Sequence, residues 1–167
     1  MRTHSRSRYY RVFDNHQPMK ELTEQEAVSR GSYVIEEHGD FHRYRRYSDG
    51  KLSSAIYAGV SSPEAAIADI RARREGVLAE IFSSSTPAKD GGYRWREWHL
   101  DRDGNVEWIS EPEYRSDGGH RRITTLAPDG ALNHFTDYLY DTDDNLTELV
   151  HHGPDGEITS REDADQP

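Results

Sequence analysis

Between residues 93 and 160, short runs of apolar and aromatic residues alternate with polar turns at regular distances. The steps between successive turns are 14, 12, 14 and 12 residues, so two copies of a 26-residue period follow one another. Each step has room for one strand and its turn. The pattern therefore predicts an antiparallel up-and-down β-meander of about six strands. Asp-Gly occupies the turns at 103–104, 117–118, 129–130 and 155–156, and Asp-Asp-Asn occupies the turn at 143–145.

The predicted strands do not separate cleanly into an apolar face and a polar face. In the strand at 131–140, one face would carry Tyr138 and Tyr140 among polar residues, and the other would carry Phe135 and Leu139. A sheet that is covered on one side and offered to a partner on the other fits this pattern. A strongly curved sheet that packs on itself fits it as well.

The first half of the chain mixes helix and strand signals. Thr23, Glu26 and Gly31 form a capping box and a helix stop. The sequence Ser-Pro-Glu at 62–64 predicts a second helix, from Pro63 to about Glu75, with the serine as its cap. Ala66, Ile67 and Ile70 would form the apolar stripe of that helix. Apolar and aromatic segments around these helices predict the order β-α-β-β-β-α-β.

These patterns predict a β-rich α+β fold, in which a small mixed unit is followed by an antiparallel up-and-down meander. The mixed unit would span residues 1–85 and the meander residues 93–160. The segment 86–92 contains Pro, Gly and Asp with no apolar residue larger than Ala, so it predicts a linker. Residues 161–167 would form a flexible acidic tail.

Charge is distributed unevenly along the 167 residues, whose net charge is −10. Residues 1–85 carry 13 Lys and Arg against 12 Asp and Glu, whereas residues 86–167 carry 8 against 19. The acidic half would repel nucleic acid and anionic lipid and attract a basic partner; a solubilising surface explains it equally well. The chain has no cysteine, no signal-peptide pattern and no long apolar run, so a cytoplasmic protein without membrane contact is expected.

The turn-and-tyrosine pattern resembles two kinds of bacterial β-hairpin repeat. Tyr-x-Tyr-Asp followed by a turn and Leu resembles the YD repeats of Rhs proteins, and Asp-Gly-x-Leu resembles MORN-variant repeats of antitoxin-like proteins. The resemblance covers roughly residues 93–160 and implies a β-hairpin interaction module from bacterial toxin and immunity systems; it carries over no catalytic residue. The YD pattern matches Tyr138, Tyr140, Asp141 and Leu146, with Asp144 in place of glycine, and the MORN-variant pattern matches 49–52 and 129–132.

Known catalytic and metal-binding patterns are not met by the candidate residues. His151 and His152 are adjacent on a predicted strand and would point to opposite faces, which disfavours a shared metal ion. The serine run at 83–85 lacks a nucleophile elbow, and the acidic residues after 140 lack the spacing of a calcium loop. The interleaved arginines and tyrosines of the segment 43–47 could stack on and follow a nucleic-acid strand, which the net charge disfavours. Tyrosines in the core, with the arginines paired to the acidic half, explain the segment at least as well. No metal and no cofactor are expected.

The sequence therefore predicts a non-enzymatic protein-binding module, most concretely an immunity protein or antitoxin that occludes a basic bacterial toxin or effector. The alternative is a small enzyme or ligand-binding domain with a site between the two units, using His99, His134, Tyr138 or Tyr140. A partner-binding surface needs charges opposite to those of its target and aromatic anchors. The residues expected to form it are Asp137, Tyr138, Tyr140, Asp141, Asp143, Asp144 and Glu148.

Overall fold

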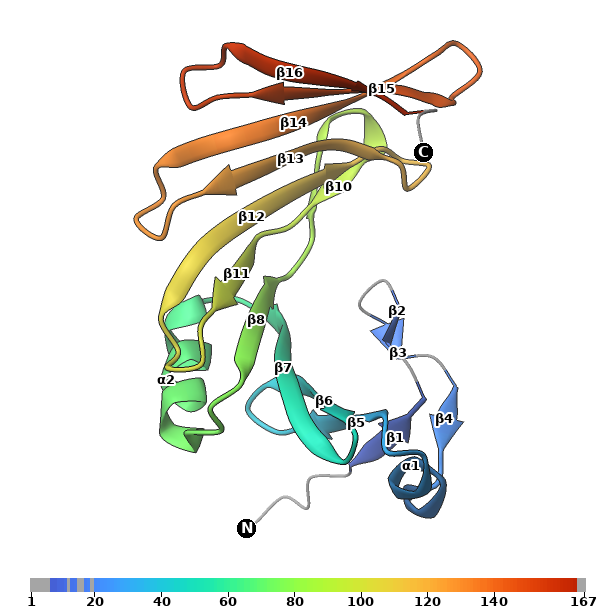
Figure 1. The fold of residues 1–167 in the computed structure, drawn as a ribbon, viewed down its shortest axis with the longest axis vertical. Coiled ribbons are helices and arrows are strands. Elements are labelled where there is room, and N and C mark those ends of the chain that lie inside the picture. Colours follow the sequence, from blue (N-terminus) through green and yellow to red (C-terminus); the bar gives the residue numbers. More distant parts are fainter. Residues whose placement is uncertain (1–6, 12, 15–16, 19, 165–167) are drawn as a thin grey trace. The chain divides into compact units, whose positions relative to one another are not determined.

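The computed structural model describes residues 7–11, 13–14, 17–18 and 20–164 (Figure 1). The chain divides into two compact units, one formed by Met1–Ser83 with His99–Asn105 and the other by Ser84–Trp98 with Val106–Pro167. Mixed elements come first and sequentially paired strands follow, so the predicted β-rich α+β fold is confirmed. None of the helices in the described residues is long and apolar enough to cross a membrane.

The first unit is built on a sheet with the strand order β8-β7-β6-β5-β1-β4. The pairs are antiparallel except β7 with β8, which are parallel and are connected through α2. A separate two-stranded ribbon is formed by β2 and β3. The elements are β1 (Arg8–Tyr10), β2 (Phe13–Asp14), β3 (Gln17–Pro18), β4 (Glu21–Leu22), α1 (Glu24–Arg30), β5 (Tyr33–His38), β6 (His42–Ser48), β7 (Lys51–Val60), α2 (Pro63–Arg73) and β8 (Leu78–Ser83).

Local signals account for most of these elements. The predicted order β-α-β-β-β-α-β is present as β1, α1, β5, β6, β7, α2 and β8, while the two-residue strands β2, β3 and β4 were not predicted. Thr23 and Glu26 form the predicted capping box of α1, and Gly31 ends that helix at φ 74°. The turns at 39–41 and 49–50 join β5 to β6 and β6 to β7.

The second helix differs in detail from the sequence prediction. Ser62 stands at the N-cap position, but its side chain donates to the Glu64 carboxylate and caps no backbone amide, so the predicted serine cap is wrong. Proline at the first helical position fixes the start of α2 instead. Ala66 is fully buried, whereas Ile67 and Ile70 are half-buried. The contact with β7 and β8 is therefore centred on a small residue, which allows close approach of the helix.

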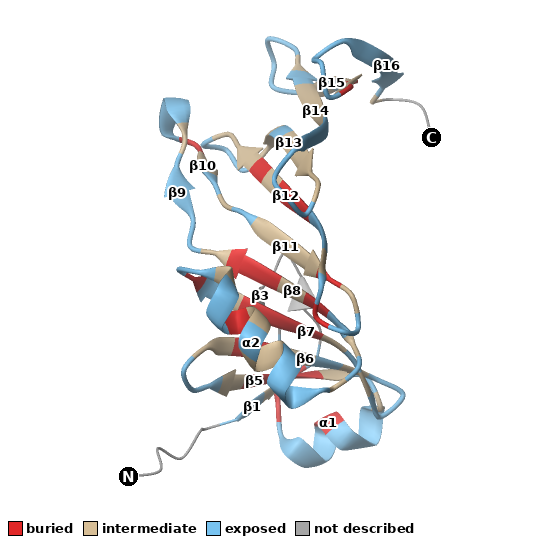
Figure 2. Ribbon diagram, turned by 90° about the vertical axis from the view of Figure 1, so that its left-hand side faces the viewer, coloured by how far each residue is buried: buried red, intermediate tan, exposed pale blue. Residues whose placement is uncertain are grey.

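Buried residues of the first unit concentrate on β7 and β8 (Figure 2), where Tyr57 and Ile81 face each other across the parallel pair. The buried Arg43 is 2 % exposed; it forms ion pairs with Glu37 and Glu75, and its guanidinium lies 5.3 Å from the centre of the Tyr57 ring. Arg45 also binds Glu37. These arginines thus find their counter-ions inside the first unit, which corrects the expected pairing with the acidic half.

The second unit is a meander in which β12, β13, β14, β15 and β16 each pair antiparallel with their chain neighbours. A short strand, β10, adds to the other edge of β12 and itself pairs with β9. Residues 86–92, expected as a linker, contain β9 and a 3-10 turn, and residues 161–163 of the expected tail belong to β16; residues 165–167 lie outside the described residues. The elements are β9 (Thr86–Pro87), η1 (Lys89–Gly91), β10 (Tyr93–Arg94), β12 (Val106–Tyr114), β13 (His120–Leu126), β14 (Leu132–Tyr140), β15 (Leu146–His152) and β16 (Ile158–Asp163), while β11 (Glu97–Leu100) begins in this unit and ends in the first.

The five predicted turns all exist and share one backbone geometry. In each, the amide of the first residue donates to the carbonyl of the fifth, and the amide of the fourth donates back to the carbonyl of the first. The fourth residue has a positive φ, which glycine tolerates best. That residue is Gly104, Gly118, Gly130, Asp144 or Gly156. Residues 93–160 are all described and contain no helix, so the repeat predicted from the turn spacing is confirmed.

Candidate functional site

Five aromatic side chains, four from strands and one, Trp95, from the segment after β10, stack into a continuous row on one face of the second unit. Tyr93 lies on Tyr114 with ring centres 5.0 Å apart and planes 7° apart, and Trp95 stacks on the same tyrosine at 4.8 Å. The row continues from Tyr114 to His120 at 4.4 Å and from His120 to Tyr138 at 5.1 Å. We refer to these five residues as the aromatic ladder.

Strand register builds the ladder. Tyr93 is the cross-strand partner of Tyr114, and Tyr114 is the partner of His120, so all three side chains emerge on the same face. A β-bulge between Glu113 and Tyr114 sets the second of these pairs. Directly opposed side chains lie close enough for rings to stack, which makes the ladder a consequence of pairing.

The ladder is partly withdrawn from water although the described residues of the second unit contain no α-helix to cover it. Burial raises the pKa of the Tyr114 hydroxyl to about 12 and also raises the pKa of Tyr138. Burial lowers the pKa of the His120 imidazole, because the charged form loses hydration. The rings therefore shield one another and form a rigid, half-exposed apolar surface.

The two tyrosines of the predicted partner surface lie at this face, but they have different roles. Tyr138 is the last ring of the ladder. The hydroxyl of Tyr140 donates a hydrogen bond to the carbonyl of His120 at 2.8 Å, and the Arg115 guanidinium lies 4.3 Å from the centre of its ring. Tyr140 thus ties β14 to β13, which makes Tyr138 the better candidate for an anchor.

Three of the predicted acidic residues are neutralised by arginines of the second unit itself. Arg122 donates two hydrogen bonds to Asp137, at 2.6 and 2.9 Å, and Arg161 contacts both oxygens of Glu148 at 2.9 Å. Asp144 forms an ion pair with Arg115. The side chain of Asp137 leaves the face of β14 opposite to that of Tyr138. Glu148 is the cross-strand partner of Leu139 and lies on the same face as Asp137. The seven predicted residues therefore do not form one surface.

The remaining two acidic residues lie at the tip of the β14–β15 hairpin. One oxygen of Asp141 accepts hydrogen bonds from the amides of Asp143 and Asn145, which together with the Asn145 side chain lowers the pKa of the Asp141 carboxyl. Asp143 is exposed and forms no ion pair with any of the described residues. Asp141 has a structural role in the turn, while Asp143 leaves its charge available to solvent or to a partner.

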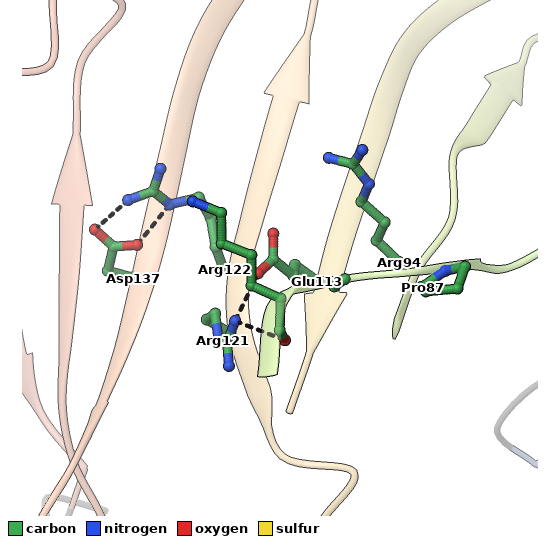
Figure 3. A pocket seen from close by; sticks show the side chains of 8 residues that line it. Pro87, Arg94, Glu113, Arg121, Arg122 and Asp137 are labelled. Atoms are coloured by element: carbon green, nitrogen blue, oxygen red, sulfur yellow. Dashed lines mark hydrogen bonds and ion pairs between the residues drawn. The ribbon is translucent and has the colours of Figure 1, made fainter. Parts of the chain in front are cut away.

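A cavity of about 540 Å³ is lined by residues of the second unit (Figure 3). Glu113 and Asp137, which line it, are sequence neighbours of the ladder residues Tyr114 and Tyr138, so their side chains leave the opposite face of the sheet. Its lining includes the Arg122–Asp137 pair and Arg121, which contacts Glu113 at 3.1 Å and donates to the carbonyl of Lys89. Lys89 and Arg94 also line it, and neither forms an ion pair with a described residue. The lining therefore carries more positive than negative side chains, which suits an anionic group. The acidic composition of this half of the chain gave no sign of such a site.

The first unit contains a group of potential metal ligands that the sequence patterns did not predict. Glu36 and His38 on β5 and His42 on β6 place their ligand atoms within 4.8 Å of one another. Glu36 is 6 % exposed; burial raises the pKa of its carboxyl, but hydrogen bonds with Tyr10 and His42 outweigh this, so the pKa is lowered. The sequence around the β5–β6 turn contained a usable signal, because residues two apart on a strand share a face and residues flanking a tight turn face each other.

Comparison with known proteins gives no further information on this arrangement. No family model matches the chain, and no curated protein or solved structure matches it.

Proposed function

We propose that the chain is a non-enzymatic protein-binding module, most concretely a cytoplasmic immunity protein or antitoxin that occludes a basic bacterial toxin or effector. The aromatic ladder is the observation that carries this proposal. Tyrosine and tryptophan dominate the energetic centres of protein interfaces because they bury a large area with few rotatable bonds. A row of such rings, half-exposed on a sheet face with no α-helix among the described residues of its unit, is a surface suited to a partner.

Stacking within the ladder favours tight docking. Tyr114 contacts Tyr93, Trp95 and His120, so its rotamer is fixed before any partner arrives. A side chain that is already ordered loses little conformational entropy on binding, and that loss is a principal cost of association. The ladder therefore offers preorganised contact area at its centre, on Tyr114.

The acidic residues support the choice of a basic partner through the field of the whole unit. Asp137, Asp144 and Glu148 are already paired, so they contribute mainly to the net charge of the acidic half. Net charge acts over roughly a Debye length and accelerates encounter with a partner of opposite sign. Asp143, without an internal counter-ion among the described residues, is the residue best placed for a direct contact.

Coexpression tests this proposal. The chain would be produced in its native host together with the product of the neighbouring gene, and both growth and copurification would be recorded. We expect growth protection and a stable complex with the wild-type chain, and loss of both with the double variant Tyr114→Ala, Tyr138→Ala. Tyr33 and Tyr47 stack at 4.7 Å on the first unit and provide the control variant Tyr33→Ala, which should protect fully. Protection by a folded ladder variant equal to that of the wild type would refute the docking face.

A further inference from the structure

The tip of the β5–β6 hairpin gathers three potential metal ligands on one face of the first unit. His38 and His42 are direct cross-strand partners, and their rings stack with centres 4.5 Å apart. Glu36 precedes His38 by two residues and therefore shares its face. Its Oε1 atom lies 2.6 Å from Nε2 of His42 and 3.3 Å from Nε2 of His38. Both imidazoles thus present the same nitrogen to the same carboxylate oxygen.

The carboxylate is held in this orientation by two tyrosines. The hydroxyl of Tyr10 donates to Oε2 of Glu36 at 2.7 Å, which leaves Oε1 directed at the histidines. Tyr44 donates to Oε1 at 3.3 Å. Such hydrogen bonds from surrounding residues orient the ligands of metal centres and tune their affinity. They come from β1 and β6, so the position of Glu36 is fixed by three strands of the sheet.

The donor set selects the kind of ion. Two imidazoles and one carboxylate suit zinc and neighbouring transition metals, whereas calcium and magnesium prefer oxygen ligands alone. Bonds of about 2.0–2.1 Å place the donors of a tetrahedral centre roughly 3.3 Å apart. One distance from Oε1, 3.3 Å, equals that value and the other, 2.6 Å, is shorter, and all three donor atoms lie within 4.8 Å of one another. A rearrangement of side chains at the hairpin tip would complete the centre.

We propose that Glu36, His38 and His42 bind one divalent transition-metal ion of the zinc class. The side chains of His38 and His42 are 54 % and 37 % exposed, so at least one coordination position remains open to water or to a ligand. Such a site differs from His151 and His152, whose side chains leave opposite faces of β15. It lies in the first unit and does not depend on the protein-binding role of the second.

Metal titration of the full chain tests this site. The purified protein, stripped with a chelator, would be titrated with Zn²⁺ by calorimetry and with Co²⁺ by visible absorption. We expect one equivalent of Zn²⁺ bound with micromolar or tighter affinity, and Co²⁺ bands typical of four- or five-coordination. His38→Gln and His42→Gln should each weaken binding by at least about tenfold, and Tyr10→Phe should weaken it by about tenfold or more through the orientation of Glu36. His134→Gln, a change at an exposed histidine of the second unit, is the control and should leave binding unchanged.

A change at His38, the more exposed of the two histidines, distinguishes loss of metal binding from loss of folding. Because His38 is more than half exposed, His38→Gln should retain the wild-type circular dichroism spectrum and melting temperature in the absence of metal. Zn²⁺ should raise the melting temperature of the wild type, since binding to the folded state alone stabilises it, and should not raise that of His38→Gln. Absence of saturable Zn²⁺ binding by the wild type would overturn the proposal, as would Co²⁺ bands that persist unchanged in both histidine variants.

Discussion

Tyr114 stacks on Tyr93 with ring centres 5.0 Å apart and planes 7° apart, and the two residues are cross-strand partners in β12 and β10. This pair joins the segment that leads into the meander to the first long strand of the meander itself. It also begins the aromatic ladder. The close approach of the Gly92 backbone to the Tyr114 carbonyl, next to this pair, brings the two strands near enough for the rings to stack.

Gly92 makes that backbone contact, and its replacement by alanine should destabilise the protein. A Cβ atom there would lie 2.0 Å from the carbonyl oxygen of Tyr114, although the φ of −75° suits any residue. Relief of such a clash requires a backbone shift, and we expect Gly92→Ala to cost at least about 1–3 kcal/mol in the free energy of unfolding, measured by denaturant titration. Gly39→Ala is the matched control, because a Cβ there meets nothing within 4 Å. Equal stability of the two variants would contradict close packing of β10 on β12.

Ala66 should be more sensitive to enlargement than its neighbour in sequence. Ala66 is fully buried on the face of α2 that packs on the sheet, whereas Ala65 on the same helix is exposed. Ala66→Leu should therefore cost about 1–3 kcal/mol through overpacking, while Ala65→Leu should change stability by less than about 0.5 kcal/mol. Thermal unfolding followed by circular dichroism distinguishes them. If the two variants melt together, α2 does not pack on β7 and β8 through this residue.

Asp144 is the one non-glycine residue among the fourth positions of the five meander turns, and it has a φ of 64°. Asp144→Gly should relieve backbone strain of about 1 kcal/mol and lose an exposed ion pair with Arg115 that contributes less. Arg115 retains Asp117 at 2.8 Å. We expect an unchanged or slightly higher stability, and a loss of about 1 kcal/mol or more for Gly130→Ala, whose φ is 86°. A clear loss in Asp144→Gly would show that the ion pair outweighs the strain.

His120 should make stability fall as the solution becomes acidic. Burial lowers the folded-state pKa of its imidazole below the usual 6.5, and a weaker attraction to Glu97 acts in the opposite direction. Below about pH 6.5, His120 is therefore protonated more readily in the unfolded chain than in the folded one. The free energy of unfolding decreases as the pH falls further. His120→Gln should show a shallower decrease between pH 7 and 5. Parallel curves for the two proteins would mean that His120 is not desolvated by Tyr114 and Tyr138.

Turn chemistry explains why the meander was predictable and the ladder was not. The Asp-Gly turns are encoded within five residues, and the α1 capping box within four, so sequence alone locates both. The ladder depends on register, and the bulge at 113–114 shifts the pairing of β12 with β13 by one residue, which no local pattern specifies. The strands β2, β3 and β4 have two residues each and carry too little pattern to be recognised.

Ion pairs between residues far apart in the sequence also limited the prediction of the partner surface. Arg115 reaches Asp144 across 29 residues, and Arg122 reaches Asp137 across 15. From the sequence, these acids appeared as a free negative cluster. The register of β13 with β14 places Arg122 beside Asp137, and the turn before β13 brings Arg115 to Asp144, so a count of charges along the chain overstated what the surface offers.

Binding kinetics of the partner obtained by coexpression, measured at two salt concentrations, test the docking account most directly. Tyr138→Ala should raise the dissociation rate by an amount equivalent to about 2 kcal/mol, because a buried aromatic anchor mainly slows release. The double change Asp141→Asn, Asp143→Asn retains oxygen acceptors at the turn and should slow association while making it less sensitive to salt. Rates that remain unchanged in a correctly folded Tyr138→Ala variant, as in the Tyr33→Ala control, would contradict the claim that the aromatic ladder binds the partner.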